Sequence, residues 1–163
     1  KTFYRSCIKS NEAVTVVCCD DNGMPAGFAM GSLRADGFYK RLLLRNFLPF
    51  SFEAVKLIFS KPGALVRLVK NLTKTEERSE SPDFSELLSI ASSPEFRGQG
   101  IGRKLLDSFE EKIREEGGRV VSLTTDYSDN GDVIEFYRKS GYKIENDFIS
   151  YPDRRMYRMI KKL

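Results

Sequence analysis

The sequence predicts an α/β fold in which a mixed β-sheet packs against helices, built as a single domain over residues 1–163. Three observations predict it. A short apolar run, a glycine-rich turn, an amphipathic helix and a second apolar run follow one another between residues 84 and 125, which is the order of a parallel crossover. An Asp-Asn-Gly turn joins two early strands, and two further β-rich runs close the chain. The sheet is therefore expected to contain parallel and antiparallel pairs.

The first expected element is a β-hairpin. Residues 14–18 are β-branched and apolar, which is typical of a buried strand, and residues 20–23 carry the Asn-Gly pair of a tight turn. Residues 26–33 are the expected partner strand. Gly27 and Gly31 within it indicate a close approach of another backbone or a β-bulge.

A basic helical insertion and a loop are expected next, over residues 34–83. Apolar residues recur there at helical spacing, and Pro49 and Pro62 separate two or three amphipathic helices. The part from Arg34 to Lys74 holds nine basic and two acidic residues, in a chain whose formal net charge is only +4. These helices are expected to wall a pocket for an anionic molecule, to lie on an acidic membrane surface, or to pack with a solvated charged face. Because no motif of a DNA- or RNA-reading fold is present, nucleic acid is not an expected partner.

The remaining elements alternate strand and helix before the closing pair. Their expected bounds are 84–91 for a strand, 101–116 for a helix, 120–125 for a strand, 130–139 for a helix, and 142–149 and 155–160 for the closing antiparallel strands. The first helix should bury Ile101, Leu105, Phe109 and Ile113 and end at the glycine pair 117–118. Asp129 or Asn130 is the expected cap of the second helix.

Composition excludes several kinds of chemistry. The chain has no histidine, which rules out Ser-His and Cys-His nucleophiles and histidine-based metal sites, so no metal is expected. The three cysteines, Cys7, Cys18 and Cys19, are an odd number and are expected to be buried, reduced thiols of a cytoplasmic protein. No apolar run of about 18 residues and no signal-peptide pattern is present.

The turn between the central strand and its helix is the strongest functional signal. Gly98, Gly100 and Gly102 alternate at a helix start, which leaves backbone N–H groups uncovered where the helix dipole is positive and predicts a site for a phosphate. The P-loop pattern is excluded because Leu105 stands where its Ser or Thr would be. The dinucleotide pattern is excluded because its third glycine would fall on Arg103 or Leu105.

Two blocks resemble one known family. The pattern Arg-x-x-Gly-x-Gly at Arg97, Gly100 and Gly102 resembles the pyrophosphate loop of the GNAT superfamily of acyl-CoA-dependent N-acyltransferases. Residues 130–142, Asn-Gly-Asp-Val-Ile-Glu-Phe-Tyr-Arg-Lys-Ser-Gly-Tyr, resemble the family element with an Asn at the helix start, an aromatic pair and a glycine–aromatic exit. The blocks occur in family order within residues 84–148. The resemblance implies a GNAT-like fold and acetyl-CoA as the acyl donor.

The resemblance also implies which residues bind the donor. Backbone groups of Ile90, Ala91 and Ser92 would pair with the pantetheine arm, and one N–H would face the developing oxyanion. The expected pyrophosphate ligands are Arg97, Gly98, Gln99, Gly100, Ile101 and Gly102, with Arg103 or Lys104 adding charge unless these side chains are simply solvated. Asn130 and Phe136 would contact the donor from the second helix, although a capping role alone also explains Asn130.

Acid–base chemistry falls to two further residues. Tyr137 matches the family's general-acid tyrosine, because a phenol with a pKa of ~10 stays protonated at neutral pH and can protonate a thiolate. The alternative is a core aromatic residue beside Phe136. Glu86 is the expected base, directly or through water, but its strand leaves open whether it faces substrate or solvent. Asp126 and Asp129 are weaker alternatives.

The implied activity is direct acetyl transfer, in a ternary complex, to a primary amine of a small molecule or peptide. An anionic acceptor such as a nucleotide-linked amino sugar suits the basic insertion. A catalytically silent acyl-CoA-binding or sensing domain is the alternative, and a homodimer is left open. In the family a strand and one or two helices precede the strand at residues 14–18, whereas about a dozen residues do so here. A fragment, or a fold starting within the first helix near residues 3–8, explains this equally well, and it leaves the acceptor pocket in doubt.

Overall fold

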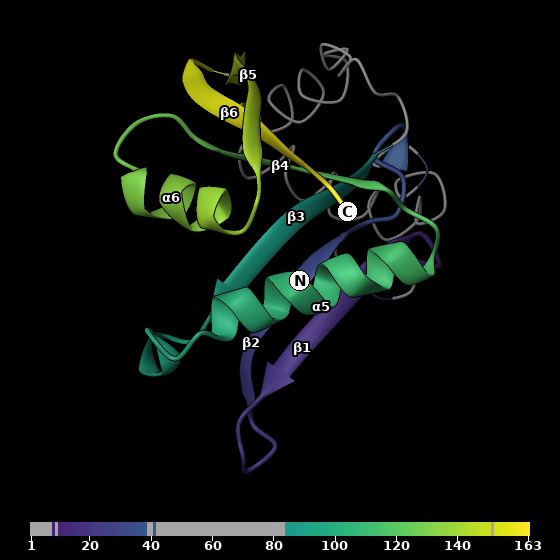
Figure 1. Ribbon diagram of the computed structural model, residues 1–163, viewed down its shortest axis with the longest axis vertical. Helices are drawn as coiled ribbons and strands as arrows, with labels where there is room; N and C mark the ends of the chain where they lie inside the picture. The colour runs from purple at the N-terminus through teal and green to yellow at the C-terminus, as the bar shows by residue number, and fades with distance from the viewer. Residues whose placement is uncertain (1–7, 9, 39–40, 42–83, 151) are drawn as a thin grey trace, which may run out of the picture.

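The computed structural model describes residues 8, 10–38, 41, 84–150 and 152–163. Within these residues, six strands form one mixed sheet in the order β1-β2-β3-β4-β6-β5, and helices α5 and α6 pack beside it (Figure 1). The bounds are β1 Ala13–Cys19, β2 Pro25–Ser32, β3 Ser85–Ser92, α5 Ile101–Glu115, β4 Val120–Asp126, α6 Gly131–Lys139, β5 Lys143–Ser150 and β6 Arg154–Lys162, with a 3-10 turn at Pro94–Phe96. The predicted α/β fold with a mixed sheet is confirmed. Most of the expected insertion lies outside the described residues.

The early hairpin forms as its sequence predicts. β1 and β2 pair antiparallel, and the Oδ1 atom of Asp20 accepts hydrogen bonds from the backbone N–H groups of Asn22 (2.9 Å) and Met24 (2.8 Å). A Cβ atom at Gly31 would overlap the carbonyl oxygen of Glu86 and the ring of Phe109. A shift in register between β2 and β3 lies beside it. Both the close approach and the bulge that the glycines indicated are therefore present.

The cysteines differ from the sequence-based expectation. Cys18 and Cys19 are free thiols, but Cys18 is only half-buried and Cys19 is exposed, so the prediction that they are buried is wrong. The reason is the place of β1, which forms one edge of the described sheet. Its register against β2 also shifts between these two residues, at the end of the strand. Cys7 lies outside the described residues.

The main core lies between the sheet and α5, which crosses β1, β2 and β3 (Figure 1). The four apolar residues expected to face the sheet are all buried, and Leu106 joins them. Burial of each such side chain contributes roughly 1.5–3 kcal/mol. Met30 and Phe38 form a smaller cluster, against which Phe28 and Leu88 pack.

A buried ion pair joins α5 to the last strand. Glu110 is 2% exposed, and its Oε2 atom accepts a hydrogen bond from Lys161 Nζ at 2.6 Å. Arg114, one helical turn further along α5, lies 4.0 Å from the same oxygen. The ion pair between α5 and β6 is therefore shorter than the ion pair within α5.

The sheet divides between β3 and β4. These strands are parallel neighbours only over three pairs, from Ser85–Val121 to Leu87–Leu123. Leu88 is the extra residue of a β-bulge against β2, because Met30 pairs with Ser89 and Gly31 with Leu87. Beyond the bulge β3 stays with β2, β4 stays with β6, and Figure 1 shows the two strands diverging. Alternate backbone groups of β3 consequently point into this split instead of toward another described strand.

Candidate functional site

The glycine turn enters α5 through two residues in a left-handed conformation. Gly98 has a φ angle of +80° and Gly100, the N-cap of α5, has a φ angle of +76°. Other residues lose about 1–2 kcal/mol in this conformation. A Cβ atom at either position would have nothing within 4 Å. The backbone, rather than crowding, therefore requires glycine here, and the surface of the turn is open.

The start of α5 presents uncommitted backbone donors. The first hydrogen bond of the helix runs from Lys104 N to Gly100 O at 3.0 Å, so the N–H groups of residues 101–103 have no acceptor within the helix. The first turn of α5 holds no acidic residue, and Arg97 is exposed immediately before it. Donors and positive dipole thus coincide, which is what binding of an anion requires. The buried side chain of Ile101 leaves only its backbone N–H for such a role.

The end of β3 leads into this turn. Residues 90–92 pair with β2, and the chain is then held by a hydrogen bond from Ser93 N to Ala26 O at 2.8 Å. Ile90 is half-buried, while Ala91 and Ser92 are exposed. The three residues expected to contact the pantetheine arm therefore lie along the split, directly before the glycine turn.

Helix α6 lies against the first turn of α5. A Cβ atom at Gly102 would stand 3.6 Å from Cζ of Phe136, and the Phe136 and Tyr137 ring centroids are 5.2 Å apart. Tyr137 is 7% exposed and packs edge-on against Tyr142, with centroids 5.7 Å apart. Burial raises the pKa of Tyr137 to about 12, so its phenol keeps its proton throughout the neutral range. Tyr137 is thus a core aromatic residue that also retains a transferable proton.

Arg103 contacts α6 and its own helix. Its Nε atom lies 3.0 Å from both carboxylate oxygens of Asp107, and Nη1 donates to the carbonyl oxygen of Lys139 (3.2 Å) and to Ser140 Oγ (3.3 Å). Ser140 Oγ in turn donates to Phe136 O at 2.8 Å. These contacts connect the two helices, whereas the sequence predicted a contribution to phosphate binding.

Asn130 is at the N-cap of α6, but its side chain does not cap the helix. It turns back to the end of β4, where Nδ2 donates to Thr125 Oγ1 at 2.6 Å and to Asp126 O at 3.2 Å. The prediction of a capping side chain is therefore wrong for Asn130. The reason is that the preceding loop, with Asp129 at a φ angle of +53°, folds Asn130 onto the strand.

Among the three candidate bases, Glu86 has the most enclosed side chain. It is 8% exposed and lies on the sheet face opposite α5, because its neighbour Leu87 belongs to the core beneath that helix. Asp126 is instead paired with Arg154, whose hydrogen bonds hold the pKa of that carboxyl below its usual value. Asp129 is exposed on the loop. The open question of whether Glu86 faces solvent is thus answered, since it is buried.

Two hydroxyl groups in the same region were missed from the sequence. Ser32 on β2 and Ser122 on β4 are buried, and neither Oγ atom has a hydrogen-bond partner. Nothing in the sequence singles them out, because only the strand register brings them beside Glu86. Within the described residues, no group of three Cys, Asp or Glu side chains could hold a metal ion, and no helix is long and apolar enough to span a bilayer.

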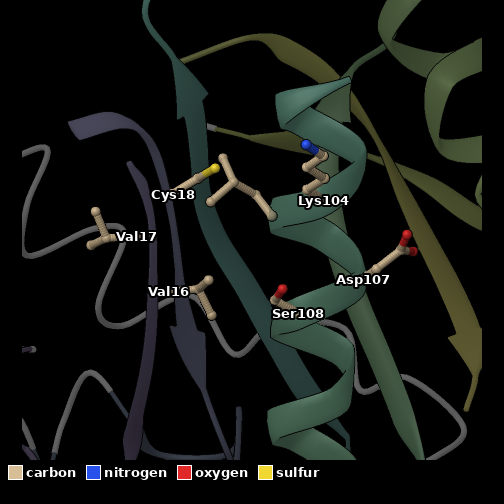
Figure 2. Close-up of a pocket in the computed structure, with 7 residues that line it drawn as sticks. Val16, Val17, Cys18, Lys104, Asp107 and Ser108 are labelled. Atoms are coloured by element: carbon tan, nitrogen blue, oxygen red, sulfur yellow. The ribbon is translucent and has the colours of Figure 1, made fainter. Parts of the chain in front are cut away.

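A separate groove of about 400 Å³ runs between β1 and α5. Residues 16–18 line one side and residues 104, 105, 107 and 108 the other. Figure 2 shows Cys18 on the side of β1 that faces the helix, with Val17 directed away from it. Lys104, predicted as an alternative to Arg103 for adding charge beside the phosphates, lines this groove, whereas Glu86, Tyr137 and the glycine turn do not.

Comparison with known proteins shows the family to which these sequence patterns belong. A sequence model of the acetyltransferase (GNAT) family matches residues 2–142. An uncharacterized N-acetyltransferase of Methanocaldococcus jannaschii is 34% identical over 64 residues, which are 39% of this chain and 28% of that protein. The matched part therefore spans little more than a quarter of that relative.

Solved structures share the fold. The ribosomal-protein-S18-alanine N-acetyltransferase from Escherichia coli aligns over 99% of this chain and 74% of its own, with a TM-score of 0.60 and 14% identity. An aminoglycoside 6'-N-acetyltransferase complexed with coenzyme A aligns over 94% of this chain and 74% of its own, with a TM-score of 0.57 and 17% identity.

Proposed function

Because the chain belongs to the acetyltransferase (GNAT) family, we propose that it transfers an acetyl group from acetyl-CoA to a primary amine. The observation that carries the proposal is the glycine turn, where Gly98 and Gly100 are left-handed and unobstructed and the N–H groups of residues 101–103 have no acceptor within the helix. A diphosphate is the anion that this donor set suits best. The relative solved with coenzyme A supports the same choice of donor.

The remaining donor contacts extend from this turn. Arg97 supplies charge beside the phosphates, and the backbone of residues 90–92 provides hydrogen-bonding groups along the split for an extended arm. Asn130 and Phe136 contact the donor from α6. Acetyl-CoA, when bound, supplies a thioester carbonyl and a thiolate leaving group. The backbone N–H groups of β3 that point into the split stabilise negative charge on the carbonyl oxygen.

Tyr137 and Glu86 move the protons. The incoming ammonium group gives one proton to the carboxylate of Glu86, and the amine nitrogen then forms its bond to the carbonyl carbon while the C–S bond breaks. Tyr137 donates its phenolic proton to the departing sulfur and is restored by the second proton that the new amide nitrogen loses. The raised pKa of Tyr137, about 12, keeps that proton in place until the thiolate forms. The products are the acetylated amine, the free thiol and one proton on Glu86.

The proposal identifies the acceptor only by its reacting group, a primary amine. The two solved relatives are named for a ribosomal-protein alanine and for an aminoglycoside, which are chemically dissimilar. The basic segment between Arg34 and Lys74 favours an acceptor that also carries an anion, such as an amino sugar phosphate.

A thiol-release assay tests the proposed function. The protein is incubated with acetyl-CoA and a panel of amino sugars, polyamines, amino acids and peptides, and free coenzyme A is measured. Tyr137→Phe is expected to slow amine-dependent release about 100-fold, the usual contribution of a general acid, while calorimetry shows unchanged donor affinity. Tyr142→Phe is the matched control, because it removes a neighbouring buried phenol outside the site.

Two results would contradict the proposal. Donor binding without release on any amine would favour the silent acyl-CoA-binding domain. Equal rates in Tyr137→Phe and the unsubstituted protein would remove the acid role from Tyr137.

A further inference from the structure

The groove between β1 and α5 lies along the first turns of that helix. Figure 2 shows Lys104 and Ser108 on the helix side, with Val16 and Cys18 on the strand side. Its volume of about 400 Å³ falls within the range of small-molecule sites, roughly 300–1,000 Å³. The lining combines apolar side chains with a few polar ones, which is also typical of such sites. The groove is therefore large enough for a nucleoside.

Lys104 carries the only uncompensated charge among the residues that line the groove. Asp107, the other charged lining residue, is paired with Arg103, whose Nε atom lies 3.0 Å from both carboxylate oxygens. Within the part of the chain that the structure describes, Nζ of Lys104 has no hydrogen-bond or ion-pair partner. The helix dipole disfavours a cation near the start of α5 by roughly 0.3–1 kcal/mol, and the first turn holds no acidic residue. An anion bound beside Lys104 would remove this unfavourable interaction.

The groove continues from the glycine turn on the side away from α6. Lys104 follows Gly100 by four residues, which is about one helical turn or 5.4 Å along the axis. On the other side α6 covers the start of α5, because the ring of Phe136 lies 3.6 Å from the position of a Cβ atom at Gly102. Arg103 also donates a hydrogen bond to the last turn of α6. A molecule with its diphosphate at the turn therefore has open space toward β1.

We propose that this groove binds the 3′-phosphoadenosine end of acetyl-CoA. In coenzyme A one ribose separates the 3′-phosphate from the diphosphate, and one helical turn separates Lys104 from the glycine turn. Lys104 pairs with the 3′-phosphate, and Ser108 donates a hydrogen bond to the same nucleotide. The adenine packs against the apolar wall that Val16 and Leu105 form. This inference rests on the proposed function, and it makes the 3′-phosphate a determinant of which thioester donor the protein selects.

The first experiment measures the affinities of coenzyme A and 3′-dephospho-coenzyme A by calorimetry. The unsubstituted protein is expected to bind coenzyme A about tenfold more tightly, the effect of one hydrogen bond to a charged group. Lys104→Met is expected to lose this preference, with affinity for the dephospho form within twofold of the unsubstituted protein. Lys112→Met is the matched control, because Lys112 is an exposed lysine of α5 two turns further along, outside the groove. It should keep the preference.

The second experiment tests whether the adenosine occupies the groove. Ser108→Trp places a large side chain in the groove at an exposed helix position. It is expected to weaken binding of both forms of the coenzyme about tenfold, because the adenosine is common to them. Glu115→Trp, in the last turn of α5 and outside the groove, is the control and should leave both affinities within twofold. Thermal melts of the two tryptophan variants verify that each is folded.

Any one of three results would overturn the inference. They are equal affinities of the unsubstituted protein for the two forms of the coenzyme, equal losses in Lys104→Met and Lys112→Met, and unchanged affinities in folded Ser108→Trp. Failure of the unsubstituted protein to bind either form would overturn the proposed function as well. That result is distinguishable from the other three, because in each of those the unsubstituted protein still binds coenzyme A.

Discussion

Arg103, in the first turn of α5, donates a hydrogen bond from Nη1 to the backbone carbonyl oxygen of Lys139, in the last turn of α6, over 3.2 Å. A cation at the C-terminal end of α6 also interacts favourably with the negative end of the dipole of that helix. Arg103 therefore joins the helix that begins at the glycine turn to the helix that carries Tyr137.

The first prediction separates this connection from phosphate binding. Arg103→Ala is expected to lower the free energy of unfolding by about 1 kcal/mol, or the melting temperature by roughly 2–4 °C, and to change coenzyme A affinity less than twofold. Arg97→Ala is expected to weaken coenzyme A binding about tenfold with little effect on stability. Calorimetry and thermal melts on both variants check this. Equal losses of affinity would instead make Arg103 a phosphate ligand, as the sequence alone suggested.

The second prediction concerns the left-handed glycines at the two ends of α5. Gly100→Ala and Gly117→Ala should each lose about 1–2 kcal/mol of stability, because both positions have φ near +80° and room for a Cβ atom. Only Gly100→Ala should also weaken coenzyme A binding, by about tenfold, because it alters the turn that presents the N–H groups. Titration calorimetry gives the two affinities. A similar affinity in both variants would argue against an anion site at the turn.

The third prediction is a loss of stability in alkali. The unfolded chain loses the Tyr137 proton near its usual pKa of ~10, while the folded protein keeps it up to a pKa of about 12. The stabilisation is therefore complete below pH 10 and disappears as the pH rises to 12, at about 1.4 kcal/mol per pH unit. Urea unfolding between pH 8 and 11 measures the slope. Tyr137→Phe should have a shallower slope than the unsubstituted protein, and identical slopes would show that the phenol titrates normally.

The fourth prediction tests the buried ion pair. Lys161→Met leaves the carboxylate of Glu110 buried without its 2.6 Å partner, which should cost about 3–5 kcal/mol. Adding Glu110→Leu to that variant should restore most of the stability, because an apolar pair of similar volume replaces the charges. Lys162→Met, at the exposed neighbouring position, is the control. Chemical unfolding of the four proteins checks this, and a mild effect of Lys161→Met alone would refute it.

Local patterns were sufficient to predict much of the fold. Three features depend only on residues that are close in sequence, and they could therefore be predicted without a structure. They are the Asn-Gly turn, the apolar face of α5 and the glycines after each helix. The glycine turn belongs to this class, because the left-handed conformation of Gly100 and the free N–H groups after it follow from a strand that runs directly into a helix. Its position before α5 was predicted correctly for that reason.

Features that depend on strand order and register were not predictable in this way. The exposure of Cys19 follows from β1 lying at the edge of the described sheet. Ser32 and Ser122 lie on either side of Glu86 only because β2 and β4 flank β3 in one particular register. Arg103 and Lys139 are 36 residues apart, and no periodicity links them. Such relationships are set by tertiary packing, to which a single sequence gives little access.

The short ladder between β3 and β4 has a mechanical consequence. Within the described sheet, three residue pairs join a half made of β1, β2 and β3 to a half made of β4, β6 and β5. A molecule bound at the split would contact both halves of the sheet. It would thereby limit the movement of one half relative to the other. Binding of a molecule at the split should consequently affect turnover and also reduce the flexibility of the sheet.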